Sequence, residues 1–407
     1  MNQEGSPTNQ TFADDTTMDV MAARPLHRIM VLLNKPADWS SFRSGLSMLL
    51  LAALSAAAWW LLFTDINLAL LVGALLLLFF LGDLLILCAL PRLRISYGSW
   101  QPQFFQLAIL RTLAAIGIGI FALFSGWVWG LLLIVTVQVL GTAALIWGAV
   151  VEPARLQTRE LEIRTDRLNR GTRPIRLFHI SDLHIERLSR REDDILRSIE
   201  IEQPDLIVIT GDYVNLSYNR DPETYRQIHG FLAQLSAPFG VYATLGTPTV
   251  DIRDNVVPMF DDLPVNLLRG ECRPVTLGDG QRIVLLGLDC THHIGPDAAL
   301  LGRLAGQAPV DAVQLLLYHS PELMPQAVEE EIDLYLCGHT HGGQVRLPLI
   351  GPLLTSSQLG REYVMGLYRR GRTNLYVSRG VGLEGLSAPR VRLLARPEVT
   401  MVTIRPE

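Results

Sequence analysis

Four long apolar runs before residue 153 constrain the fold of this chain more than any other feature. They cover about residues 44–63, 67–90, 104–125 and 126–151. Each reaches or comes close to the ~20 residues that a helix needs to cross the apolar part of a bilayer. A helix in water with such a run would expose an apolar side to solvent. We therefore expect four membrane-spanning helices, which also account for the high hydrophobic content of 49%.

Charged and aromatic residues inside these runs suggest how the helices sit in the membrane. Asp83 and Arg111 are the charged exceptions within the predicted spans. Charges in lipid are usually functional or paired, but we favour an Arg111 side chain that reaches the interface near a helix end. Four tryptophans are expected at the membrane–water interfaces: Trp59, Trp60, Trp127 and Trp129.

The basic residues around the predicted spans give an orientation. They are Arg24, Arg28, Lys35, Arg43, Arg92, Arg94, Arg155, Arg159, Arg164, Arg167 and Arg170. With four spans all of them fall on one side, which the positive-inside rule predicts to be cytoplasmic. The first run begins too late for a cleaved signal peptide. The chain is therefore predicted to be integral to the cell (inner) membrane, with its soluble part in the cytoplasm.

Beyond the membrane region, four β-type apolar runs end directly in a carboxylate or an imidazole. The residues at these ends are Asp182 and His184, Asp212, His319, and the pair His339 and His341. In α/β sheets, ligands gather beyond the carboxyl ends of the strands. Carboxylates and imidazoles together suit borderline cations such as Mn, Fe or Zn. Glycines on both sides of His339 and His341 let the backbone turn close to whatever these side chains hold.

With these motifs the chain resembles the calcineurin-like metallophosphoesterase superfamily. The matching segments are Asp182-Leu183-His184, Gly211-Asp212, His319-Ser320-Pro321 and Gly338-His339-Thr340-His341. The resemblance runs from about Arg173 to the C-terminus. The segments 341–345 and 375–380 make it most similar to the membrane-associated bacterial phosphodiesterases, some of which cleave UDP-diacylglucosamine. It implies a fold of two mixed β-sheets packed together with helices outside.

The resemblance also implies roles for the residues at the strand ends. The ligands of one metal ion would be Asp182, His184 and His341, and those of a second would be Asp212, which bridges, with His319 and His339. Asp182, Asp212 and His339 are the residues expected to be catalytic, in metal-assisted hydrolysis. Two divalent ions (Mn, Fe or Zn) are the expected cofactors.

One motif departs from the family pattern. The family carries Gly-Asn-His followed by an acid after its third strand, where this chain has Gly246-Thr247-Pro248. Thr247 therefore stands where the family has an asparagine ligand of the second metal, and its hydroxyl is an uncertain substitute. Pro248 stands where the family has a histidine that can protonate the leaving group. The second metal site and the acid step are the parts of the mechanism that this change affects.

The chain is predicted to divide into four parts. These are a polar tail (1–42), a four-helix membrane region (43–152), a basic linker (153–172) and the metallophosphoesterase domain (173–407). The linker is expected either to contact anionic headgroups or to serve as a plain positive-inside anchor. In the domain we predict strands at 175–180, 205–210, 240–245, 282–288, 312–317, 333–337, 374–378 and 398–404. Helices are predicted at 190–202, 222–235, 297–306 and 322–331.

The remaining histidines and the cysteines are expected to have structural or solvent-exposed positions. His179 is predicted to pack in the core. His292 and His293 are predicted to be solvated loop residues, with the alternative that one of them reaches the site and replaces the lost acid. The four cysteines show no paired spacing, which fits a reducing compartment, and Cys337 is predicted to be a small buried residue.

Two functions from different classes remain open at this point. The first is a membrane phosphoesterase acting on a phosphorylated lipid or nucleotide-linked lipid through phosphodiester or pyrophosphate hydrolysis. The second is a degenerate relative that binds metal or phospholipid as a sensor or scaffold, which the Thr247-Pro248 change favours. A nuclease is the weaker interpretation, because the soluble part lacks a basic stripe with interleaved aromatics, so no nucleic-acid partner is expected. The sequence predicts no oligomeric state.

Overall fold

The computed structural model describes residues 31–95, 98–278, 280–384 and 390–407. Much of the polar tail, with Arg24, His27 and Arg28, lies outside these residues. Four helices form the membrane region, and all four are long and apolar enough to cross a bilayer. Their bounds are α2 Ser41–Phe63, α3 Ile66–Ala89, α4 Trp100–Ser125 and α5 Trp127–Ile146. A short π-helical turn, Trp147–Val151, extends α5. The four predicted helices are thus confirmed.

Two predictions inside the helical region are wrong. Trp59 is fully buried, and its indole N–H donates to Ala115 O at 2.9 Å, so it does not lie at an interface. Trp60, Trp127 and Trp129 are exposed, as interface residues would be. Arg111 does not reach a helix end: its guanidinium is buried and pairs with Asp83 between α3 and α4.

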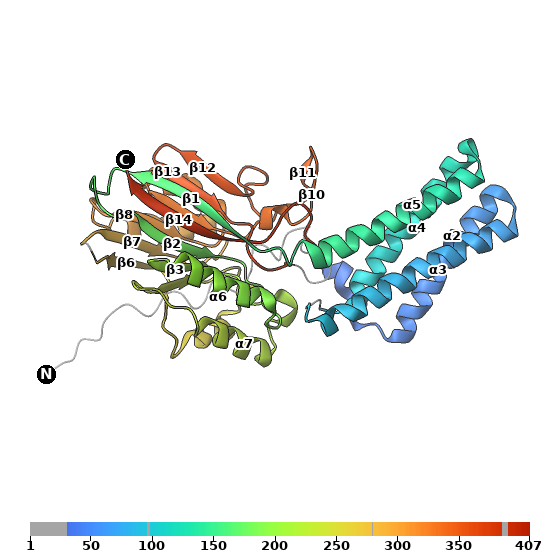
Figure 1. The fold of residues 1–407 in the computed structure, drawn as a ribbon, viewed down its shortest axis with the longest axis horizontal. Coiled ribbons are helices and arrows are strands. Elements are labelled where there is room, and N and C mark those ends of the chain that lie inside the picture. The colour runs from blue at the N-terminus through green and yellow to red at the C-terminus, as the bar shows by residue number, and fades with distance from the viewer. Residues whose placement is uncertain (1–30, 96–97, 279, 385–389) are drawn as a thin grey trace.

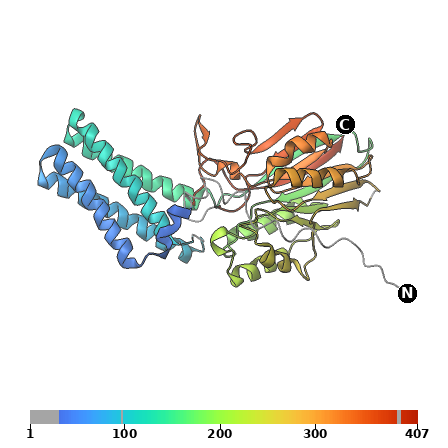
Figure 2. The same cartoon turned by 180° about the vertical axis from the view of Figure 1, so that it is seen from behind.

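The domain contains two six-stranded sheets of mixed direction (Figures 1 and 2). The first has the order β1-β14-β2-β3-β4-β5 and the second the order β12-β13-β9-β8-β7-β6. The strands of the first sheet are β1 Gln157–Thr165, β14 Glu398–Pro406, β2 Ile175–Ile180, β3 Leu206–Thr210, β4 Val241–Thr244 and β5 Val265–Leu267. Those of the second are β12 Gly366–Arg370, β13 Thr373–Val377, β9 Leu334–Cys337, β8 Val313–Leu317, β7 Arg282–Gly287 and β6 Glu271–Thr276. A small hairpin pairs β10 Arg346–Leu347 with β11 Gly351–Pro352.

The predicted strands and helices of the domain correspond to elements of the structure. The long helices are α6 Arg190–Glu202, α7 Pro222–Leu232 and α9 Ile294–Ala305, with shorter helices α8 Arg253–Val256 and α10 Met324–Glu329. The helix α6 begins with a capping box in which Ser189 and Glu192 satisfy each other's backbone N–H groups. Buried side chains from both sheets, such as Leu177, Leu315 and Val402, form one core between them. Separate cores lie under α6 and α7 and under α9 and α10.

The basic linker predicted at 153–172 is not a linker. Its residues 157–165 form β1, which pairs in parallel with β14 along its whole length. Two of its arginines also form ion pairs within the domain: Arg164 with Glu162, and Arg167 with Asp333 at 2.7 Å.

The helices and the domain are joined by hydrogen bonds as well as by the chain. The segment 390–396, which precedes β14, lies against the end of the α5 region. Arg392 N donates to Gly148 O at 2.8 Å, and Ala395 N donates to the Glu152 carboxylate at 2.6 Å. The domain therefore has a defined face toward the membrane helices.

Candidate metal centre

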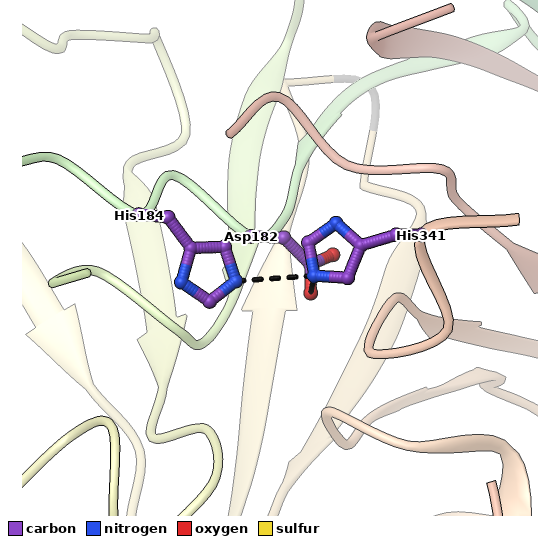
Figure 3. Close-up of side chains that lie close together, drawn as sticks. All are labelled: Asp182, His184 and His341. Atoms are coloured by element: carbon purple, nitrogen blue, oxygen red, sulfur yellow. Dashed lines mark hydrogen bonds and ion pairs between the residues drawn. The ribbon is translucent and has the colours of Figure 1, made fainter. Parts of the chain in front are cut away.

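The first group of predicted site residues converges at the carboxyl ends of β2 and β9. Asp182 and His184 follow β2, His341 follows β9, and all three side chains are buried. Figure 3 shows them pointing toward one another, with His184 Nε2 and His341 Nε2 3.1 Å apart. His341 Nε2 lies 3.6 Å from Asp182 Oδ1. The donor atoms of this group all lie within 4.8 Å of one another.

The second group lies beside the first and draws on both sheets. Asp212 follows β3 of one sheet, while His319 and His339 follow β8 and β9 of the other. His319 Nε2 lies 3.1 Å from Asp212 Oδ2, and this group also fits within 4.8 Å. The His339 backbone N–H donates to Asp182 Oδ1 at 2.9 Å, which ties the two groups together.

Unusual backbone geometry holds these side chains in place. Asp182, His184, Asp212, His339 and His341 all have left-handed φ angles, between 42° and 69°. Such conformations cost about 1–3 kcal/mol each for residues other than glycine and cluster at functional sites.

Two glycines make room for the carboxylates of the site. A Cβ on Gly338 would lie 1.9 Å from Asp182 Oδ2, and one on Gly246 would lie 2.1 Å from Asp212 Oδ1. No other residue fits these two positions without displacing a carboxylate. The glycine of the altered motif thus keeps a steric role even though Thr247 and Pro248 differ from the family pattern.

The donor atoms fit divalent cations. Asp182 Oδ2 and His339 Nε2 are buried with no hydrogen-bond partner among the residues that the structure describes. Two imidazole nitrogens that face each other at 3.1 Å, beside a carboxylate, need a proton or a cation between them. Oxygen and imidazole nitrogen without thiolate suit Mn, Fe or Zn. The groups can therefore hold metal ions, and the ligand roles assigned from the sequence stay a prediction that this geometry supports.

Burial and close charges shift the pKa values of the site histidines in opposite directions. Burial opposes the charged form of His184, but Glu384 and Asp212 outweigh it and raise its pKa to about 9. Burial, together with His292 and His319, lowers the pKa of His339 to about 3. Burial also lowers the pKa of His341, and His184 adds to this effect. Protons on these imidazoles would compete with cations for the same lone pairs.

The sequence did not predict a role at the site for three residues that the structure places there. Glu384 Oε2 lies 2.8 Å from His184 Nε2 and forms a third possible metal-holding group with His184 and Asp212. The buried Asp251 carboxylate accepts from the backbone N–H groups of Asp212 and Gly246, both at 2.8 Å. Arg392 lies with its guanidinium 3.4 Å from His341 Nδ1. None of them belongs to a short motif, so only their position in the fold brings them to the site.

The altered motif and His292 meet at one edge of the second group. Thr247 N donates to Asp212 Oδ1 at 2.7 Å, and Thr247 Oγ1 lies 3.5 Å from His339 Nδ1. His292 is buried, contrary to the solvated position predicted for it: its Nε2 lies 3.2 Å from Thr247 Oγ1, and its ring packs 4.8 Å from that of His339. His293 is only half-buried. His179 and Cys337 are buried core residues, as predicted.

Comparisons with known proteins agree with this site. Residues 175–343 match the family model described as calcineurin-like phosphoesterase. YkuE, an uncharacterized metallophosphoesterase of Bacillus subtilis, is 31% identical over 269 residues, which cover 64% of this chain and 89% of that protein. The phosphodiesterase YaeI of Escherichia coli is 30% identical over 237 residues, which cover 57% of this chain and 82% of that protein.

The name of a third relative includes both a transmembrane region and a metallophosphoesterase domain. It is a Bos taurus protein described as a transmembrane protein with metallophosphoesterase domain. It is 28% identical over 262 residues, which cover 60% of this chain and 56% of that protein.

Proposed function

Since this chain belongs to the calcineurin-like phosphoesterases, we propose that it is a membrane-anchored, metal-dependent phosphoesterase that hydrolyses phosphodiester or pyrophosphate bonds of a lipid-linked substrate. The observation that carries the proposal is that the site lies beside the helical region. Arg392 contacts His341 with its side chain, while its backbone N–H bonds to Gly148 at the end of the α5 region. Arg392 thus links the predicted metal ligands directly to the helical region. If these helices lie in a bilayer, phosphorylated headgroups would be close to the site, which supports a lipid-linked substrate.

In the proposed hydrolysis, some residues would hold cations and others would position those ligands. Asp182, His184 and His341 would hold one cation, and Asp212, His319 and His339 a second. Divalent cations bound there would polarise the phosphoryl group and lower the pKa of water to around 7, so that no protein base is needed. Asp251 and Thr210 act through other residues. Asp251 fixes the backbone of Asp212, and Thr210 O orients His319 by accepting a hydrogen bond from its Nδ1 at 2.7 Å.

Because position 248 has no proton donor, we expect substrates whose leaving group can depart without being protonated. General acid catalysis typically contributes ~10²–10⁴-fold, mostly where the leaving group is too basic to depart unprotonated. Pro248 has no group to donate a proton. We therefore expect the fastest turnover on pyrophosphate-linked lipids or other esters with good leaving groups. Rates over leaving groups of rising pKa test this expectation, with Pro248→His in parallel. Equal rates on alkyl diesters and anhydrides would contradict it.

The second candidate function is a metal or phospholipid sensor without turnover, and the loss of the Asn-His pair at Thr247-Pro248 favours it. One experiment separates the two. The full-length protein is purified, loaded with Mn, and assayed on lipid and nucleotide diesters and on lipid pyrophosphates, with Asp182→Ala as the inactive control. Hydrolysis that needs Mn and is lost in the control supports the enzyme. Metal binding with no hydrolysis of any of these esters supports the sensor.

A further inference from the structure

The β10–β11 hairpin carries an apolar tip that nothing in the described chain covers. Leu349 at its turn is fully exposed (108%), and its neighbour Ile350 is also exposed. Two further exposed leucines, Leu353 and Leu354, follow β11 at the base of the hairpin. Single exposed apolar residues are common on soluble proteins, whereas a contiguous group marks a contact with a partner or a membrane. The tip is therefore a candidate interaction surface.

The hairpin lies at the membrane face of the domain. Val345 bridges to Leu393, and Arg346 N donates to Leu393 O at 2.9 Å. Leu393 belongs to the segment 390–396 that bonds to Gly148 and Glu152 at the end of the α5 region. In both views the hairpin stands at the end of the domain that faces the four helices (Figures 1 and 2).

The base of the hairpin is fastened to the candidate metal centre. Arg346 donates to Gly342 O at 2.7 Å, and a Cβ on Gly343 would lie 2.2 Å from Pro352 Cβ. Past the hairpin, Ser356 Oγ donates to His339 O at 2.7 Å. Whatever the tip binds is thus held at a fixed position relative to His339 and His341.

Basic residues stand beside the apolar tip. Arg361 donates to Pro352 O at 2.8 Å and to Ile350 O at 3.3 Å, and its side chain is exposed at this edge, whereas Arg346 at the base is half-buried. An apolar tip with arginines behind it matches the membrane interface, where apolar groups enter the acyl region and cations meet headgroup phosphates. A second copy of the chain or a protein partner would not explain why this surface adjoins the membrane helices.

We propose that the tip of the hairpin, Leu349 and Ile350, inserts into the lipid leaflet next to the domain. Its further role, which rests on the proposed function, is to hold the candidate metal centre against phosphorylated headgroups at that surface.

Spin labelling of the full-length protein in phosphatidylcholine–phosphatidylglycerol vesicles tests the insertion. A label is placed at Leu349→Cys, or at Val310→Cys as the matched control, after Cys88 and Cys272 are replaced by serine. Val310 is equally apolar and exposed (86%) but precedes β8, at the opposite end of the strand from His319. Label 349 should be more accessible to oxygen than to a water-soluble nickel chelate, and label 310 should show the reverse. If label 349 behaves like label 310, or is shielded from both reagents by protein, insertion is wrong.

An activity comparison tests the role of the hairpin at the metal centre. The variant Leu349→Asp with Ile350→Asp should lose turnover of a vesicle-borne phosphodiester roughly tenfold more than turnover of a soluble diester, because carboxylates are disfavoured both in the acyl region and beside anionic headgroups. Equal losses on both substrates would overturn the role in presenting headgroups. If label 349 is inserted but the unmodified protein hydrolyses neither substrate, the proposed function fails while the membrane contact stands.

Discussion

The two carboxylate oxygens of Asp182 have different roles, one in holding the backbone and one in the predicted metal binding. Its Oδ1 accepts from the His339 backbone N–H, whereas its buried Oδ2 has no partner in the described structure. Burial, helped by Asp212, raises the pKa of Asp182 even though His319 and His184 oppose the shift. A carboxylate in this position is costly until a cation neutralises it.

Asp182→Ala should therefore abolish binding at the first site, a larger effect than the ~10–100-fold loss typical of residues behind the ligands. Mn content and titration calorimetry of the purified protein measure it. A bound ligand at ~100 times its Kd stabilises the fold by about 2.7 kcal/mol, so the rise in melting temperature on adding Mn should also shrink. Asp193→Ala on the exposed side of α6 is the matched control. A variant that binds Mn as the unmodified protein does would contradict the assignment.

His292 shows how a residue of the site can hide in a sequence. No motif marks it, and its neighbour His293 looks equivalent, yet one is buried beside Thr247 and the other is half-exposed. We expect His292 to position Thr247 and His339, because its Nε2 contacts Thr247 and its ring packs against that of His339. His292→Ala should then lower turnover by a similar factor for all leaving groups, and His293→Ala should change it little. A loss confined to alkyl esters would instead show that His292 donates the proton missing at position 248.

The motifs at the strand ends predicted both groups of converging residues, because parallel strands bring their carboxyl ends to one edge of a sheet. Glu384 and Arg392 were beyond such reasoning, since both lie between β13 and β14 outside regular elements. Asp251 lies in the short turn between β4 and α8, and no spacing in the sequence marks its bonds to Asp212 and Gly246.

Among the secondary-structure elements, those with strong apolar periodicity were predicted and those at sheet edges were not. The strands β2, β3, β8 and β9 are mostly apolar and are buried at nearly every position. The outer strands β1 and β12 carry several exposed residues and charged side chains, so their sequences look like linker or loop. Their strand conformation comes from pairing with β14 and β13, a tertiary effect.

The pair Asp83 and Arg111 joins the membrane helices. Arg111 Nε and Nη2 bond to the two carboxylate oxygens at 2.6 and 2.7 Å, and its Nη1 donates to Gln138 Oε1 of α5 at 2.8 Å. Every polar group of this cluster that an isolated helix would leave in lipid is thereby paired. The sequence identified both charges but did not favour their pairing, because α3 and α4 are neighbours only once the bundle has formed.

Replacing one member of this pair should destabilise the protein more than replacing both. Asp83→Leu or Arg111→Met alone leaves one buried charge without its partner, which costs about 3–5 kcal/mol. The double variant removes both charges and should recover most of the loss. The melting temperature of the full-length protein in detergent, followed by helical circular dichroism, measures the three variants. A double variant as unstable as the sum of the single ones would show that the two side chains act independently.

At the scale of the whole molecule, Arg392 connects the candidate site to the end of the α5 region, so the site lies on the side of the domain that adjoins the four helices. An even number of spans puts both ends of the chain on one side of the bilayer. The basic residues that flank the helices on that side include Lys35, Arg92, Arg94 and Arg155. The loop around Asp65, between α2 and α3, has none. This asymmetry predicts a cytoplasmic domain.

Reporter fusions test that orientation. Green fluorescent protein, which fluoresces when folded in the cytoplasm, and alkaline phosphatase, which is active outside it, are each fused after Glu407. We expect fluorescence and no phosphatase activity, because the arginines beside the helix ends resist transfer across the membrane. Fusions truncated after Asp65 serve as the control and should give the reverse pattern. Phosphatase activity after Glu407 would place the metal centre outside the cytoplasm, or show that fewer or more than four helices span the bilayer. Either result would move the proposed substrate to the outer leaflet.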